Sequence, residues 1–274
     1  MGWHGHLELH YTRDGARTIA LDRHHGPLRV LQRLYPEGDA ICHHVLVHPP
    51  GGIVGGDVLE LDARLDAGTH ALITTPGAAR FYRSAGERAV QRVSLHLAEG
   101  ARLEWLPQET IAHRGCLGEN RLRFELAASA QMIGWDVLAL GLPASGEPFD
   151  RGEFVQHLEQ PGVWLERGRI AGTDNLLLQS PLGLAGHGVL ATMWLAAGAP
   201  LGREPGEALT DAARDCIAAQ ALPAGVTAPD ESLLVLRALA DRVEPAMQLL
   251  RAVWAAWRPL AWQLEAVPPR LWRT

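Results

Sequence analysis

The stretch Leu59-Glu60-Leu61-Asp62-Ala63-Arg64-Leu65-Asp66 alternates strictly between apolar and charged residues. A period of two puts alternate side chains on opposite faces of an extended chain, so this stretch is predicted to be a strand with one buried and one solvated face. Similar alternation recurs at residues 7–11, 93–97, 103–105 and 122–126, and glycine-containing turns separate the runs. Many short strands of this kind predict a mainly β chain, folded as a sandwich, a barrel or a coil.

Two α-helices are predicted in the C-terminal third. Apolar residues between 209 and 217 follow helical spacing behind Pro205, and a longer apolar stripe runs from residue 246 to 260 behind Pro245. A buried strand is predicted between them at 232–239. Helical spacing is lacking before residue 200, which argues against a doubly wound α/β fold. We therefore expect one domain over 1–274, with a β body at about 1–200 and a helix-containing part at about 201–274.

The composition narrows the class of protein. The 274 residues have 47% hydrophobic content and a net charge of −6, and all 25 cationic side chains are arginines. This balance argues against nucleic acid as a partner, because nucleic-acid binding needs a basic face. Three widely spaced cysteines give no disulfide framework, no secretory leader is visible, and the longest apolar run, residues 189–199, is too short to cross a bilayer. The expectation is a soluble cytoplasmic protein without membrane contact.

The most unusual segment is residues 48–57, His-Pro-Pro-Gly-Gly-Ile-Val-Gly-Gly-Asp. Two prolines and four glycines specify a rigid turn, but the Lys-Ser/Thr pair and the helix that a phosphate-binding loop requires do not follow. The segment is therefore either a structural loop or a support for His48 and Asp57. A second polar corner, residues 74–83, contains two threonines, Pro-Gly and two arginines.

Histidines are concentrated near the N-terminus, with eight of the thirteen before residue 49. His6, His10 and His96 share the polar register of their strands and are predicted to face solvent. His44 and His48 remain candidate metal ligands, although several ligands on one strand do not by themselves close a tetrahedral site.

Several phrases, taken in order, resemble the urease accessory protein family UreD, also called UreH. They are Cys42-His43 with the 48–57 segment, the corner at 75–84, Leu103-Glu-Trp-Leu-Pro-Gln-Glu109, Gly146-Glu147, residues 165–167 and Pro269-Arg-Leu-Trp272. The chain departs from the family at Arg80, where many members have lysine, at Leu142, where arginine is common, and at Leu271, where isoleucine is usual. The first two departures concern local details of the polar path for metal that the resemblance implies, and none of the three changes the resemblance itself.

The resemblance implies a fold and a function. The fold would be a β-helix-like coil of many short strands with two α-helices. The protein would be a non-catalytic scaffold that binds apo-urease, UreF and the GTPase UreG, in a homodimeric assembly formed through UreF. It would help deliver nickel to the urease active site, holding no tightly bound cofactor and passing Ni²⁺ in transit.

Nickel in transit suits carboxylates, which bind it more weakly than imidazole or thiolate. Three acids match family phrases: Asp57 after the four glycines, Asp136 in Gly134-Trp135-Asp136, and Glu166 between Leu165 and Arg167. Each is expected either to meet an arginine or to line a wet cavity, because an unpaired buried acid is costly. Partner-binding or structural roles are expected for His48, Pro49, Pro50, Gly51, Gly52, Thr75, Arg83, Arg270 and Trp272.

The competing hypothesis is a metal-dependent hydrolase that uses His44, His48 and Asp57. The chain lacks an HExxH helix, a GxSxG elbow and a general base beside a ligand cluster, so the sequence gives this reading less support. A carbohydrate-binding β-coil would need rows of exposed aromatic residues, and aromatic residues make up only 6% of the chain.

Overall fold

The computed structural model describes residues 2–273 and contains two sheets that lie face to face. The first and last residues of the predicted domain, 1 and 274, lie outside the described residues. In spatial order, the seven-stranded sheet contains β15 (Trp164–Ala171), β14 (Glu153–Gln160), β11 (Leu117–Leu126), β8 (Ala89–Leu97), β5 (Val58–Leu65), β1 (His4–Asp14) and β2 (Arg17–His25).

The second sheet has eleven strands. Its main path is β17 (Ala224–Asp230), β18 (Leu233–Ala240), β16 (Val189–Ala197), β12 (Gln131–Leu142), β9 (Arg102–Leu106), β6 (His70–Thr74), β4 (Ile41–Val47) and β3 (Arg29–Leu34). Three short strands lie off this path: β7 (Ala79–Phe81), β10 (Thr110–Ala112) and β13 (Glu147–Pro148).

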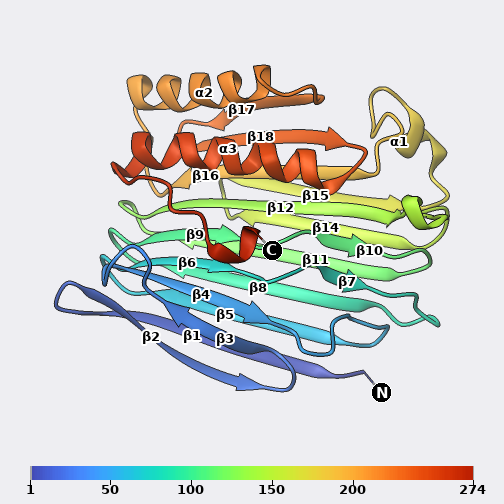
Figure 1. Cartoon of the computed structure of the whole chain (residues 1–274), viewed down its shortest axis with the longest axis horizontal. Helices are drawn as coiled ribbons and strands as arrows, with labels where there is room; N and C mark the ends of the chain where they lie inside the picture. Colours follow the sequence, from blue (N-terminus) through green and yellow to red (C-terminus); the bar gives the residue numbers. More distant parts are fainter. Residues whose placement is uncertain (1, 274) are drawn as a thin grey trace.

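The chain coils by alternating between the two sheets. From β5 to β14 it passes through β6, β8, β9, β11 and β12, so that successive strands of each sheet run parallel. Figure 1 shows these stacked coils as a progression of colour up the molecule. The mainly β, coiled fold predicted from the sequence is confirmed, and the register of β5 follows its alternation: Leu59, Leu61, Ala63 and Leu65 are buried between the sheets.

The C-terminal part extends the eleven-stranded sheet and covers its outer face. The two predicted helices are present as α2 (Arg203–Ala218) and α3 (Val243–Trp262), and the strand predicted between them is β18. An unpredicted helix of little more than one turn, α1 (Asn175–Gln179), precedes β16, and two 3₁₀ turns occupy Pro143–Ser145 and Arg270–Arg273. Across residues 2–273, no helix combines the length and apolar character needed to span a membrane.

Three apolar clusters form the core. Two lie between the sheets: one includes Leu61, Trp105 and Trp194, and the other includes Phe81 and Phe154. The third lies between the eleven-stranded sheet and the helices, where the apolar stripe of α3 is buried. The inter-sheet core is therefore divided into two parts.

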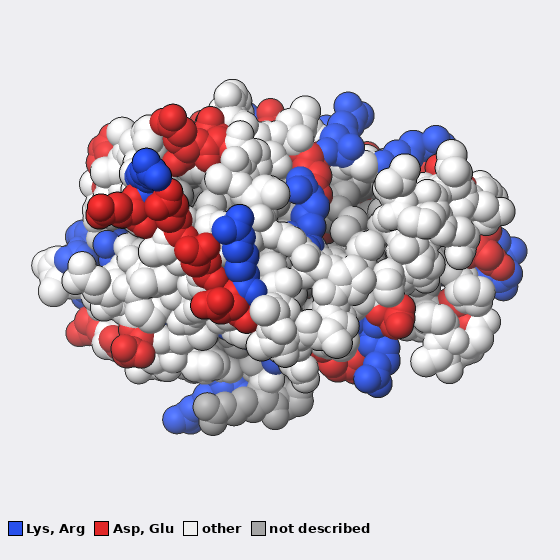
Figure 2. All heavy atoms as spheres, turned by 90° about the horizontal axis from the view of Figure 1, so that it is seen from above, with Lys and Arg blue, Asp and Glu red and all other residues white. Residues whose placement is uncertain are grey.

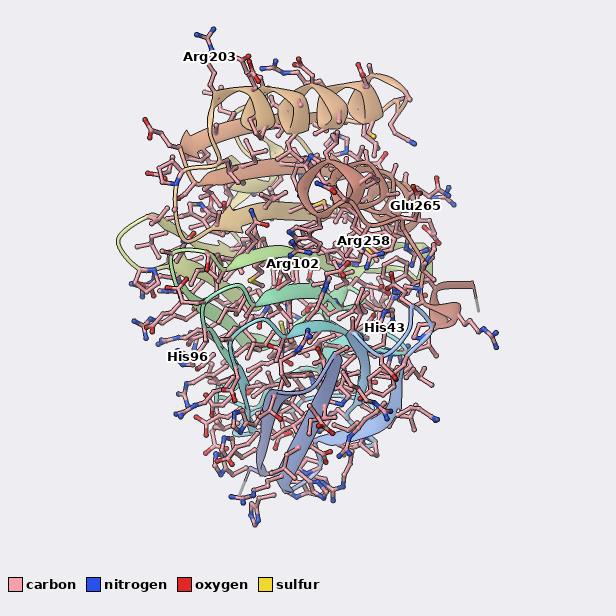
Figure 3. The ribbon with its side chains drawn as sticks, turned by 90° about the vertical axis from the view of Figure 1, so that its left-hand side faces the viewer. His43, His96, Arg102, Arg203, Arg258 and Glu265 are labelled. Atoms are coloured by element: carbon pink, nitrogen blue, oxygen red, sulfur yellow. The ribbon has the colours of Figure 1, made fainter. Side chains whose placement is uncertain are left out.

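A buried charged cluster fastens α3 to the eleven-stranded sheet. Arg258 of α3 and Glu104 of β9 are both 0% exposed, with 3.0 Å between Arg258 Nε and Glu104 Oε2. Arg258 also donates to Glu37, while His70 Nε2 and the Trp254 indole N–H lie 2.9 and 2.6 Å from the Glu104 carboxylate. Figure 3 shows Arg258 on α3 and His43 on the sheet beneath it. His43 joins this group through Glu37, with 2.7 Å between His43 Nε2 and Glu37 Oε1. We refer to Glu37, His43, His70, Glu104 and Arg258 as the helix cluster.

Candidate functional site

The glycine-rich segment between β4 and β5 forms a compact loop at the end of the sandwich. Gly51 adopts φ +75° and its N–H donates to the His48 carbonyl at 2.8 Å, which closes a tight turn. A Cβ on Gly52 would lie 2.0 Å from a ring carbon of Tyr82, so only glycine fits beside that ring. The segment is thus a specified turn packed on the neighbouring corner, and it leaves His48 half-buried beside the inter-sheet space.

Asp57 completes the same loop. Its carboxylate accepts a hydrogen bond from the backbone N–H of Trp3, just before β1, at 2.8 Å and from that of Val54, within the loop, at 2.9 Å. Both carboxylate oxygens are therefore engaged. These bonds explain why a carboxylate is tolerated at 6% exposure there. In this structure Asp57 holds the loop in shape.

A cavity of about 340 Å³ lies between the sheets beside this loop. Its outer wall is made by residues 48–49, 51–53 and 75–80, where Pro49, Gly51, Pro76 and Gly77 are exposed. Its inner wall includes Gln91, Asn120 and Asp136. This volume accommodates on the order of ten water molecules. Of the sequence-predicted residues, the cavity brings together His48, Pro49, Gly51, Gly52, Thr75 and Asp136.

Thr75 shapes the corner of the cavity. Its hydroxyl donates to the Gly77 carbonyl at 3.1 Å and accepts from the Gln108 backbone N–H at 2.9 Å. These two bonds tie the corner after β6 to the turn after β9. Thr75 therefore has a positioning role for the cavity wall.

Asp136 lies at the inner end of the cavity, on β12, with 7% exposure. Asn120 Nδ2 donates to its Oδ2 at 2.8 Å, and Gln156 Nε2 donates to its Oδ1. Both donors come from the opposite sheet and carry no charge. Burial raises the pKa of Asp136 to about 7, and the nearby Glu166 carboxylate adds to that rise, whereas the two amide donors oppose it.

Beyond Asp136 the polar residues continue toward the open edge of the sandwich. Thr192 of β16 is the register partner of Asp136, and Arg237 of β18 is the register partner of Thr192. The Thr192 hydroxyl donates to Glu166 Oε1 at 3.3 Å, and Arg237 Nε donates to Glu166 Oε2 at 2.9 Å. Glu166 is on β15, the edge strand of the seven-stranded sheet.

These residues form two hydrogen-bonded groups that meet where Asp136 of β12 and Thr192 of β16 are register partners, and we call them together the polar row. It comprises Gln91, Asn120, Asp136, Gln156, Glu166, Thr192 and Arg237. The row lies between the two inter-sheet apolar clusters and leads from the cavity to the partly exposed guanidinium of Arg237. A polar seam between apolar clusters lowers the cost of placing a cation or water inside the sandwich.

The whole chain matches known proteins of one kind. The family model described as UreD urease accessory protein matches residues 4–273. The chain belongs to the UreD family. It is 63% identical to the urease accessory protein UreD of Leptothrix cholodnii and 58% identical to that of Variovorax paradoxus, with 100% of each chain covered in both comparisons. The UreD of Polaromonas naphthalenivorans is 57% identical over 99% of both chains.

Membership of the UreD family assigns this protein a role in urease maturation. The family phrases are now explained by their positions, because several of them form the cavity wall or the polar row. The C-terminal phrase has a different place: Trp272 packs against Trp135 and Trp254, and its indole N–H donates to Thr74 Oγ1 at 3.2 Å. Arg270 is exposed, so the phrase anchors the UreD tail mainly through Trp272.

The remaining predicted residues lie away from the row. His44 is fully buried, and its Nδ1 is 2.6 Å from the Tyr11 hydroxyl. Burial lowers the pKa of His44 to about 4, and the Arg33 guanidinium contributes to the lowering, so the imidazole is neutral at physiological pH. Pro50 and Arg83 are exposed on the loop and on the corner.

The geometry gives little support to a hydrolytic metal centre. The His44 imidazole is hydrogen-bonded to the Tyr11 hydroxyl, the Asp57 carboxylate accepts from two backbone amides, and His48 lines the cavity. The three side chains therefore do not converge on one point where a metal ion could bind. Among residues 2–273, no three His, Cys, Asp or Glu side chains are grouped to hold a metal ion. The histidines predicted to face solvent do so: His6, His10 and His96 are at least partly exposed and lie beside carboxylates.

Sequence reasoning missed the amides and the arginine of the polar row. Asn120 shares the register of Leu122 and Phe124, and Gln156 shares that of Phe154 and Leu158, so both occupy positions that alternation assigns to the core. An amide at a core position of an alternating strand is a signal that could have identified both. Arg237 gives no comparable signal, because its role depends on the position of β15.

Proposed function

We propose that this UreD-family protein is a non-catalytic scaffold that binds apo-urease together with UreF and UreG and provides a route for Ni²⁺ to the urease active site. The observation that carries the route is the cavity whose inner end, at Asp136, adjoins the rest of the polar row. It places carboxylate, amide and hydroxyl oxygens in sequence between surface loops and the edge of the sandwich. Oxygen ligands suit an ion that must be released again.

Within this proposal, Asp136 and Glu166 are the path residues. Asp57 is better assigned to the loop, because its oxygens already accept two backbone hydrogen bonds. The ion would enter the cavity hydrated and exchange part of its water for Asp136 at the inner end. A resting state with a protonated Asp136 is consistent with its raised pKa, and the incoming cation would then displace the proton.

The partners and setting form part of the same proposal. The protein works in the cytoplasm, in a homodimeric assembly formed through UreF, and carries Ni²⁺ as cargo without retaining a cofactor. Exposed leucines at residues 176 and 182, which are 79% and 100% exposed, are consistent with a protein that functions inside a complex.

The route is tested by replacing Asp136 in cells that activate urease. Asp136→Asn keeps the volume and one hydrogen-bond acceptor but removes the charge, and Asp136→Leu also narrows the cavity. We expect urease activity at limiting nickel to fall at least severalfold in both variants, while the complex with UreF still forms in a pull-down. The matched control is Asp62→Asn, which removes a carboxylate from the solvated face of β5.

The outcome separates the route from assembly. Normal urease activation by both Asp136 variants would exclude a nickel path through the row. Loss of the UreF complex in Asp136→Leu but not in Asp136→Asn would indicate a packing effect of the larger side chain, and the Asn variant would then decide the question.

A further inference from the structure

The edge end of the polar row is occupied by a cationic side chain. Arg237 Nε donates to Glu166 Oε2 at 2.9 Å, and Nη2 of the same guanidinium contacts the same oxygen. The other carboxylate oxygen accepts from Thr192. Both oxygens of Glu166 are therefore engaged by groups from the eleven-stranded sheet, although Glu166 itself belongs to the edge strand of the other sheet.

The two partners differ in how free they are to move. The Glu166 side chain is 19% exposed and faces the inter-sheet space, whereas the Arg237 side chain is 46% exposed. A partly exposed ion pair makes a small net contribution to stability, because solvent screens it and the long side chain loses rotamer freedom. Arg237 can therefore swing into solvent while β18 keeps its pairing with β16.

The charge of Arg237 also matters to the interior. Glu166 acts on Asp136 as a neighbouring like charge and contributes to the rise of its pKa. A guanidinium on Glu166 offsets that negative charge while the row is empty. A divalent cation on Glu166 would do the same, so one positive group can replace the other without leaving a buried carboxylate unpaired.

We propose that Arg237 is the gate at the edge end of the polar row, and that a divalent cation and the Arg237 guanidinium compete for the Glu166 carboxylate. This gate rests on the nickel route proposed above and describes how passage along that route is regulated. An ion reaching Glu166 displaces Arg237 toward solvent, and return of Arg237 to Glu166 favours release of the ion. Arg237 is thus a positioning residue that sets how long the cation stays.

The direct test is Ni²⁺ binding to the full chain, alone or in its soluble complex with UreF, by equilibrium dialysis. Arg237→Gln removes the competing charge, and we expect Ni²⁺ affinity to rise about 3- to 10-fold. Arg237→Lys keeps a positive charge and should stay near the wild-type affinity. The double variant Arg237→Gln with Glu166→Gln should lose the gain, because the freed ligand is then absent.

A matched control distinguishes the gate from a general change in charge. Arg169 is on the same strand as Glu166, β15, and pairs with Glu153 on the solvated side. Arg169→Gln therefore makes the same change in net charge as Arg237→Gln, but away from the row. It should leave Ni²⁺ affinity unchanged. Equal affinities for wild type, Arg237→Gln and Arg169→Gln, or a gain that survives loss of Glu166, would overturn the gate.

The gate and the route fail in different ways. A defect in urease activation in Asp136→Asn, combined with no affinity change in Arg237→Gln, would overturn the gate and leave the route standing. A gain in Ni²⁺ affinity in Arg237→Gln that depends on Glu166 would support the competition at Glu166. If urease activation by Asp136→Asn were normal in the same experiments, the nickel route would be excluded. In cells, Arg237→Gln should shift the nickel concentration needed for half-maximal urease activation, and an unchanged dependence would count against the gate.

Discussion

Asp136 and Glu104 are buried carboxylates on adjacent strands of the same sheet, β12 and β9, but they face opposite sides of it. Asp136 points between the sheets and receives hydrogen bonds from two neutral amides. Glu104 points toward α3 and lies against the guanidinium of Arg258, the imidazole of His70 and the indole of Trp254. The first borders a cavity, and the second is enclosed by the helix cluster.

The different partners give the two acids opposite electrostatic properties. Burial raises the pKa of both carboxyls in isolation, but at Glu104 the hydrogen bonds and the charges of His70 and Arg258 outweigh burial, and its pKa is lowered. At Asp136 the amides do not outweigh burial, and its pKa is raised. A buried acid with a fixed counter-charge stays ionised, whereas one supported only by neutral amides keeps its proton to a higher pH.

The largest effect is expected in the helix cluster. Glu104→Ala leaves the buried His70 imidazole and Trp254 indole N–H without their partner and removes one of the two carboxylates that pair with Arg258. We therefore expect the free energy of unfolding to fall by about 3–5 kcal/mol in urea denaturation. Glu104→Gln keeps the shape and one acceptor, and Arg258 keeps Glu37, so its loss should be smaller. A loss below about 1 kcal/mol for Glu104→Ala would show that the cluster is not what holds α3.

The pH dependence of stability should separate the two acids. Because the pKa of Asp136 is raised above its unfolded value, the native state binds more protons than the unfolded state between about pH 4 and 7, and Asp136 lowers stability as pH rises through that window. The contribution of Glu104 to stability changes with pH in the opposite direction, because its pKa is lowered in the folded state. That contribution is present above the unfolded pKa and is lost as the pH falls through the folded pKa.

Asp136→Asn removes the first of these contributions. Relative to wild type, the variant should become more stable by about 2–3 kcal/mol on going from pH 5 to pH 8, measured by urea denaturation at the two pH values. The same pH change should leave the stability difference between Glu104→Gln and wild type nearly constant, since Glu104 is ionised across that range. Parallel pH profiles for wild type and Asp136→Asn would contradict a raised pKa at Asp136.

The smallest effect is expected for an ion pair on the surface. Arg203 and Glu207 of α2 form a pair one helical turn apart, with side chains 88% and 62% exposed. Figure 2 shows acidic and arginine side chains in adjacent bands over the end of the molecule that carries α2. Arg203→Ala should change the free energy of unfolding by less than about 1 kcal/mol. A larger loss would contradict the expectation that exposed ion pairs contribute much less to stability than the buried pairs of the helix cluster.

Much of the fold could be predicted from local pattern. Alternation located β5, β8 and β11, and helical spacing located α2 and α3, because each pattern follows from which side of an element meets the core. The helix α1 was missed, since its leucines are largely exposed and show no amphipathic period. The assignment of strands to two sheets also lies outside local pattern, because parallel partners are distant in sequence.

The candidate site was predictable in part. His48, Thr75, Asp136 and Glu166 were identified through family phrases, and the first three meet at one cavity. The amides that support Asp136 and the arginine that pairs with Glu166 were not identified, because those contacts join residues of different sheets. Asp57 shows the reverse case: its residue type suggested a ligand, while its hydrogen bonds assign it to a turn.

The strand faces, the two long helices, the glycine-rich turn and membership of the UreD family could all be predicted from the amino-acid sequence, since these depend on residue type and near-neighbour spacing. Which buried acid is a fixed charge and which lies on a polar row became clear only from the three-dimensional contacts. The reason is that burial and the identity of the partner set the charge state of a carboxylate. At Asp136 and Glu104 those partners come from residues 16 to 154 positions away in the chain.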